Sequence, residues 1–76
     1  MADVIGMDFK SALRKERERA GLSQGELAEK AQITRVYLNQ LEAGRKKSPS
    51  LDVFVRICRS LGVRPSTMLA RIEDDL

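Results

Sequence analysis

Apolar residues recur at helical spacing along five stretches of the chain, each bounded by capping or turn residues. The first stretch runs from about Asp8 to Ala20 and ends at Gly21. Phe9, Leu13 and Ala20 share one face of it and should be buried. Because no stretch alternates apolar and polar residues as a half-buried strand does, the pattern predicts an all-α chain.

Residues 23–44 predict two short helices, three residues apart. Ser23 is placed to cap the first helix, with Glu26 three residues later completing a capping box. Thr34 is placed to cap the second helix, and Gly44 to end it in the left-handed conformation. This is a helix-turn-helix arrangement, which is typical of DNA-binding proteins.

The second of these helices has an outward face suited to base edges. If Leu38 and Leu41 point inward, guanidinium, amide and methyl groups point away from the core. Arginine can bind guanine O6 and N7, an amide can bind adenine, and valine can touch a thymine methyl. The predicted base-reading residues are Thr34, Arg35, Val36, Asn39 and Gln40.

Two further helices follow. One extends from a Ser50 cap to Leu61, and the other begins at Pro65, a residue favoured in a first helical turn. The residues expected to point inward from the earlier helix are Leu51, Phe54, Ile57 and Cys58. Cys58 is thus interpreted as a small core residue rather than a reactive thiol.

From about Phe9 to Leu69 the chain resembles the Cro and phage-repressor (XRE-type) helix-turn-helix family. The resemblance rests on LSQ at 22–24, LA at 27–28, LNQLEAG at 38–44, PSL at 49–51 and LGV at 61–63. It implies a compact, five-helix, lambda-repressor-like domain with a recognition helix at about 34–43, and a homodimer on a two-fold DNA site. Gln32 departs from the family because such turns usually carry glycine, which tolerates positive φ.

The resemblance and the positions of basic and polar residues along the chain predict further roles. Matching positions in related repressors pair Arg17 with Glu42, although both side chains could instead be solvated. Gln24 matches a glutamine that grips the DNA backbone, and it also favours a helix N-terminus. Tyr37 could contact a phosphate or sugar, or pack against the preceding helix. The predicted phosphate-binding residues are Arg14, Ser23, Gln24, Tyr37, Arg45, Lys46 and Lys47.

Length and composition limit the remaining choices. The 76 residues form one domain at 8–72, with an N-terminal arm at 1–7 and an acidic tail at 73–76. The net charge of +3 is concentrated in the basic segment that contains the helix-turn-helix. One cysteine and no histidine argue against a disulfide, a metal site or a general base. We therefore expect a cytoplasmic protein without cofactor, membrane segment or small-molecule ligand.

The apolar residues near the C-terminus exceed what so small a core is expected to bury. They predict a homodimer interface made of Val63, Met68, Leu69 and Ile72.

The sequence is compatible with three kinds of function to different degrees. A repressor or controller protein that binds a palindromic operator is favoured by the polar outward face of residues 35–40. An antitoxin or adaptor that mainly binds a protein should show an apolar patch there. An enzyme is disfavoured because no set of catalytic residues can be assembled from this sequence. If the protein activates transcription, Glu26, Glu29 and Asp52 are candidates for contacting RNA polymerase, although they could equally have no such role.

Overall fold

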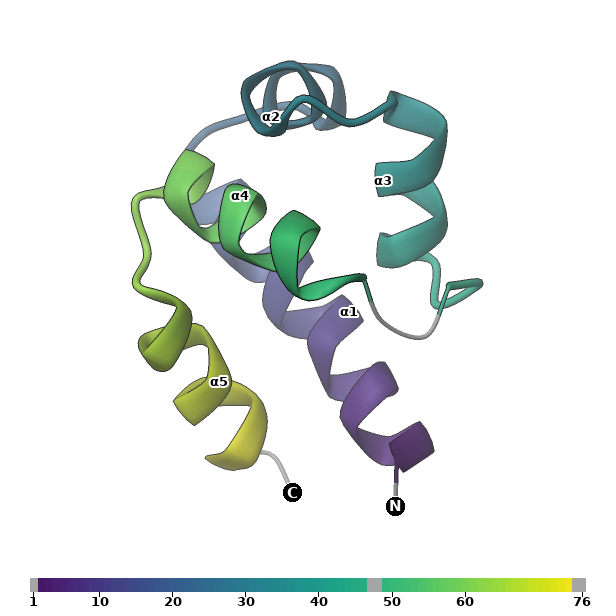
Figure 1. The fold of residues 1–76 in the computed structure, drawn as a ribbon, viewed down its shortest axis with the longest axis vertical. Helices are drawn as coiled ribbons and strands as arrows, with labels where there is room; N and C mark the ends of the chain where they lie inside the picture. The colour runs from purple at the N-terminus through teal and green to yellow at the C-terminus, as the bar shows by residue number, and fades with distance from the viewer. Residues whose placement is uncertain (1, 47–48, 75–76) are drawn as a thin grey trace.

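The computed structural model describes residues 2–46 and 49–74, which form five α-helices (Figure 1). Their bounds are α1 Ala2–Arg19, α2 Gln24–Ala31, α3 Arg35–Glu42, α4 Leu51–Leu61 and α5 Pro65–Asp74. The described residues contain no strand, so the predicted all-α, five-helix fold is confirmed. α2 lies beyond the end of α1 that leads into it, while α3 and α5 pack against α1 and α4 lies in front of it in this view (Figure 1).

The helix ends follow the turn residues of the sequence. Gly21, Gly44 and Gly62 all have positive φ, at 72°, 77° and 73°. Gln32 has a φ of 59° at the end of α2, where the resemblance leads one to expect glycine. At the start of α4, the Ser50 hydroxyl accepts a hydrogen bond from the backbone N–H of Val53 and caps the helix.

Two terminal boundaries differ from the sequence-based expectation. α1 begins at Ala2 rather than at Asp8, so residues 2–7 are its first turns and not an arm. The segment contains no proline, and Gly6 weakens a helix without ending it. At the other end α5 continues to Asp74, so the helix includes the first residues of the expected acidic tail.

The core lies where all five helices meet. Its fully buried large side chains come from every helix: Leu13, Leu27, Leu38, Leu41, Ile57, Met68 and Cys58. Phe9 of α1 packs against Phe54 of α4 with the ring centroids 5.9 Å apart. Cys58 has no exposed surface, and burial raises the pKa of its thiol to about 11, in keeping with a core role.

Two residues expected in the core lie outside it. Ala20 is exposed because α1 ends at Arg19 and the chain turns through Gly21, so Ala20 no longer follows the buried face. Leu51 is 77% exposed, because it is the first residue of α4 and the helix reaches the core only at Phe54, one turn later.

The premise of the predicted dimer interface is wrong for two of its four residues. Met68 is completely buried and Ile72 is 4% exposed, both within the core of the single chain. They are covered because α5 packs against both α1 and α4. Val63 is half-buried, and Leu69 is 55% exposed on the other face of α5.

A buried carboxylate also connects α1 to α5. Glu16 is 4% exposed and forms ion pairs with Arg71 of α5 and with Arg19 one turn along α1. The Arg19 pair is 3.3 Å long. Arg71 and Arg19 both keep exposed surface, so the buried Glu16 is paired with two arginines that reach the solvent.

Candidate nucleic-acid interface

The N-terminus of α2 is fixed by reciprocal hydrogen bonds. The Ser23 hydroxyl accepts from the backbone N–H of Glu26 at 3.0 Å, and the Glu26 carboxylate accepts from the backbone N–H of Ser23 at 2.8 Å. Hydrogen bonds to the Glu26 carboxylate, first from the Ser23 backbone and then from the Ser23 side chain, lower the pKa of Glu26. Ser23 is exposed, so a phosphate contact from this residue is compatible with its cap role.

The N-terminus of α3 is capped in a similar way by one hydroxyl. Thr34 accepts a hydrogen bond from the backbone N–H of Tyr37 at 3.0 Å. Thr34 therefore orients the recognition helix, whatever it contributes to base contacts. Tyr37 is half-buried and packs against the core. Part of its side chain stays exposed, so packing does not exclude the predicted contact with a phosphate or sugar.

Half of the predicted contact residues line one open hollow of about 320 Å³. The lining residues are Gln24, Arg35, Val36, Asn39, Gln40 and Arg45. Four predicted base-reading residues thus lie beside two predicted phosphate contacts. Within the hollow, Val36 is 69% exposed, although an apolar side chain is normally drawn inward.

A bidentate ion pair lies behind this hollow. Arg17 Nε donates to Glu42 Oε2 at 2.6 Å, and Arg17 Nη2 donates to Glu42 Oε1 at 3.0 Å. Arg17 Nη1 also donates to the carbonyl of Leu22 at 2.9 Å. The structure thus brings Arg17 and Glu42 together, and the pair connects α1 to α3 and to the turn that precedes α2.

Gln24 connects this ion pair to the outward face of α3. Its Nε2 donates to Glu42 Oε1 at 3.0 Å, and its Oε1 accepts from Asn39 Nδ2 at 3.4 Å. Hence the amide of Gln24 is oriented by a buried carboxylate on one side and by a predicted base-reading residue on the other.

Glu42 remains a carboxylate although its side chain is only 1% exposed. Burial raises the pKa of Glu42, but hydrogen bonds from Arg17 and Gln24 and the charges of Arg17 and Arg14 outweigh it, leaving the pKa below its ordinary value. The hydrogen bond to Glu42 raises the pKa of Arg17. The pair is therefore charged on both sides.

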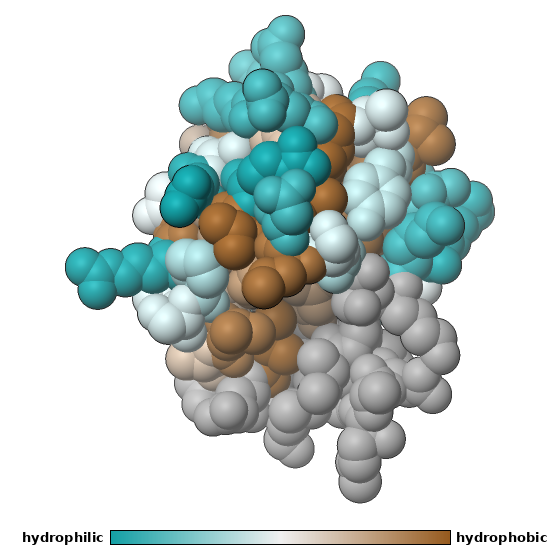
Figure 2. Space-filling view, viewed as in Figure 1, coloured by the Kyte–Doolittle hydropathy of each residue, from teal (hydrophilic) through white to brown (hydrophobic). Residues whose placement is uncertain are grey.

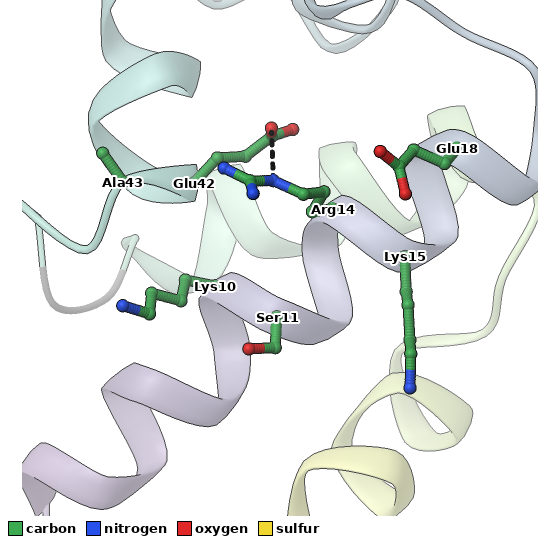
Figure 3. A pocket seen from close by; sticks show the side chains of 7 residues that line it. All are labelled: Lys10, Ser11, Arg14, Lys15, Glu18, Glu42 and Ala43. Carbon is green, nitrogen blue, oxygen red and sulfur yellow. Dashed lines mark ion pairs between the residues drawn. The ribbon is translucent and has the colours of Figure 1, made fainter.

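A second open hollow, of about 380 Å³, lies between α1 and the end of α3 (Figure 3). Its lining residues are Lys10, Ser11, Arg14, Lys15, Glu18, Glu42 and Ala43. Arg14 points toward Glu42, with its Nε 3.8 Å from Oε1, and stays 58% exposed (Figure 3). Arg17 already occupies both oxygens of Glu42, so the Arg14 guanidinium keeps a largely solvated positive charge.

Lys10 is a basic residue of this surface that sequence reasoning did not select. Its stem lies beside Gly44, where a Cβ atom would come within 3.1 Å of Lys10 Cδ. Lys10 stands one helical turn before Arg14, and this i, i+4 spacing was the available signal. Of the predicted loop contacts, Arg45 and Lys46 are exposed, while Lys47 lies outside the described residues.

Other kinds of site find little support in the described part of the chain. Residues 2–46 and 49–74 hold no group of three or more side chains suited to a metal ion. Among the same residues, no helix is long and apolar enough to cross a membrane.

Comparison with known proteins places this geometry in context. A family model for helix-turn-helix proteins matches residues 13–68. An uncharacterized HTH-type transcriptional regulator of Mycobacterium tuberculosis is 38% identical over 61 residues, which cover 80% of this chain and 43% of that protein. Another, from Methanothermobacter thermautotrophicus, is 45% identical over 54 residues, covering 71% of this chain and 77% of the relative. The chain thus spans less than half the length of the mycobacterial relative.

Solved structures show the same fold. The clp gene regulator ClgR from Corynebacterium glutamicum superposes with a TM-score of 0.87 at 30% identity, over 93% of this chain and 74% of that one. The restriction-modification controller protein C.AhdI from Aeromonas hydrophila gives a TM-score of 0.78 at 29% identity, over 90% of this chain and 98% of that one. Both neighbours are named as regulatory proteins and not as enzymes.

Proposed function

Since the chain belongs to the XRE-type (Cro/phage-repressor) helix-turn-helix family of transcriptional regulators, we propose that it binds a palindromic operator in double-stranded DNA as a homodimer. The observation that carries the proposal is the hollow in which Arg35, Val36, Asn39 and Gln40 stand beside Gln24 and Arg45. It combines groups that can distinguish base edges with groups that can hold phosphates.

In this proposal Arg35 supplies the strongest base contact. It lies in the first turn of α3, the part of a recognition helix that reaches base edges, and its planar fork matches the two acceptors of guanine. Val36, 69% exposed, is available to a thymine methyl group. Asn39 and Gln40 extend the contacts to neighbouring bases, with Thr34 at the start of the helix.

Phosphate contacts surround the base-reading residues. Gln24 and Ser23 lie at the N-terminus of α2, where free backbone N–H groups and the helix dipole attract an anion. Arg14 contributes an exposed guanidinium from α1. The exposed loop residues Arg45 and Lys46 follow α3, and the proposal extends to Lys47 and to the accessible part of Tyr37.

Exposed apolar surface supports a homodimer, although the proposed interface is smaller than the sequence led us to expect. Leu69 is 55% exposed on α5, and half-buried Val63 precedes that helix. Figure 2 shows further apolar surface at the centre of the face on which α4 and α5 lie. Two copies related by two-fold symmetry would space their α3 helices along a palindromic site.

The same residues favour DNA over a partner protein as the ligand of α3. An adaptor is expected to present a contiguous apolar patch, whereas the outward face of α3 carries one exposed valine among arginine and amide groups. A contact with RNA polymerase would best involve Glu29. Glu26 takes part in the α2 cap, and Asp52 pairs with Arg56. A reader of operator DNA in a prokaryotic cell works in the cytoplasm, and the proposal includes that location.

Selection of bound sites from a random DNA pool tests the proposal directly. A palindromic consensus supports homodimer binding, and recovery of no preferred sequence contradicts the proposal. On the selected site, Arg35→Ala should lose about 1–3 kcal/mol of binding free energy and become indifferent to one base pair per half-site. Arg59→Ala, an equal charge change at an exposed position of α4, is the control. Equal losses on selected and random DNA would make Arg35 a phosphate contact.

A further inference from the structure

The turn between α2 and α3 has a backbone conformation that its residue disfavours. Gln32 has φ 59° and ψ 42°, and the other described residues with positive φ are all glycines. In the left-handed region the Cβ atom of an L-residue crowds the following carbonyl oxygen. The turn amides nevertheless close hydrogen bonds onto α2, from Gln32 N to the Glu29 carbonyl at 3.2 Å and from Ile33 N to the Ala28 carbonyl at 3.0 Å.

A side chain from α4 reaches this turn. Arg56 Nη1 lies 3.4 Å from the carbonyl oxygen of Gln32 and donates to it. Arg56 Nη2 pairs at 3.4 Å with Asp52, one turn earlier on α4. The side chain of Arg56 is 33% exposed and that of Asp52 is 79% exposed, so the acid approaches the guanidinium from the solvent side. α4 packs against α2, and this packing brings Arg56 to the turn.

We propose that Arg56 is a positioning residue: it holds the α2–α3 turn in its left-handed conformation and thereby sets the direction in which α3 presents its DNA-facing side chains. Thr34, the cap of α3, follows Gln32 by two residues. A change of φ and ψ at residue 32 would therefore rotate α3 as a unit relative to α2. The hydrogen bond from a charged donor favours the one geometry in which the Gln32 carbonyl points at α4.

The first test measures the turn without DNA, by native-state hydrogen exchange of the Ile33 amide. Arg56→Met keeps most of the stem and removes the donors, and should speed local exchange about fivefold, as for the loss of one hydrogen bond. In a Gln32→Gly background the same substitution should have little effect, because glycine adopts positive φ without Cβ crowding. Arg59→Met, on the exposed part of the same helix, removes an equal charge as the control.

An exchange rate that responds to Arg56→Met and Arg59→Met alike, or equally with glutamine and glycine at residue 32, would overturn the proposal. If Arg56→Met does not fold, Arg56→Lys serves instead. Lysine keeps the charge near Asp52 but lacks the planar fork, so the same direction of change is expected.

The second test rests on the proposed function and uses DNA selected as described above. Arg56→Met should lower the ratio of selected-site to random-site affinity about fivefold, and Gln32→Gly should restore that ratio. A purely structural defect would lower both affinities together, and that result would contradict positioning. If the wild-type chain binds no DNA, the proposed function fails while the exchange measurement still decides the role of Arg56. If exchange at the turn is unaffected, positioning fails while the function can stand.

Discussion

Glu42→Gln removes one charge from the ion pair that connects α1 to α3 while keeping the volume of the side chain. Arg17, whose side chain is only 14% exposed, would lose its counter-charge and at least one of its two hydrogen bonds to residue 42, because an amide offers a single acceptor oxygen, and would keep the bond to the Leu22 carbonyl. Removing one partner of a buried pair costs roughly 3–5 kcal/mol. The bond to Leu22 and the remaining exposure of Arg17 favour the lower end, so the variant should lose about 3 kcal/mol of unfolding free energy.

The matched control replaces both charges. Arg17→Met with Glu42→Met leaves no stranded ion and fills the same space with apolar atoms, so it should cost only about 1 kcal/mol. Urea unfolding followed by circular dichroism measures each variant, with sucrose added to all samples if the single variant is too unstable to give a folded baseline. Losses below about 1 kcal/mol for Arg17→Met and for Glu42→Met measured singly, which add in the double variant, would refute the reasoning, because the two charges would then be solvated independently.

Three further predictions follow from the same structure. The pKa of Glu42 in the folded protein lies below its ordinary value of 4.5, so its contribution to the unfolding free energy should be complete above about pH 4.5 and fall as the pH drops through the folded pKa. Unfolding measured at decreasing pH should therefore show a smaller loss of unfolding free energy for Glu42→Gln than for the unchanged chain. Arg45→Ala and Lys46→Ala should weaken binding to all DNA sequences and reduce the slope of log K against log salt by about one per true contact, whereas an unchanged slope assigns them to solvent. Leu69→Asp should weaken self-association in sedimentation with little change in unfolding free energy, and Ile72→Asp should destabilise the fold itself; a monomer with full operator affinity would remove the dimer from the proposal.

The features that the sequence predicted best depend on residues close together along the chain. The cap of Ser23 by Glu26 needs only three-residue spacing and backbone geometry, and the structure has it. The Gly21 and Gly44 helix ends are local in the same sense. Such signals sufficed for five helices, and the family resemblance supplied their arrangement.

Features that depend on contact between distant segments were harder to predict. Amphipathic spacing places Met68 and Ile72 on one face of α5 but does not say whether the same chain or a second copy covers that face. Glu16 shares the helical spacing of Phe9 and Leu13, so its burial had a signal, but its partner Arg71 is on the last helix. The link from Gln24 to Asn39 requires the relative orientation of two helices, which spacing does not specify.

Because Cys58 is buried, the rate at which its thiol is labelled can report how often the core opens. Thiol reagents attack the thiolate, and this thiol has neither exposed surface nor an accessible thiolate while the core is closed. Since it is the single cysteine of the chain, every labelling event reports one opening of the core. At high reagent concentration the labelling rate equals the opening rate, and at low concentration it follows the open population. The lifetime of the native state, with or without DNA, can thus be timed by mass spectrometry on the unmodified sequence.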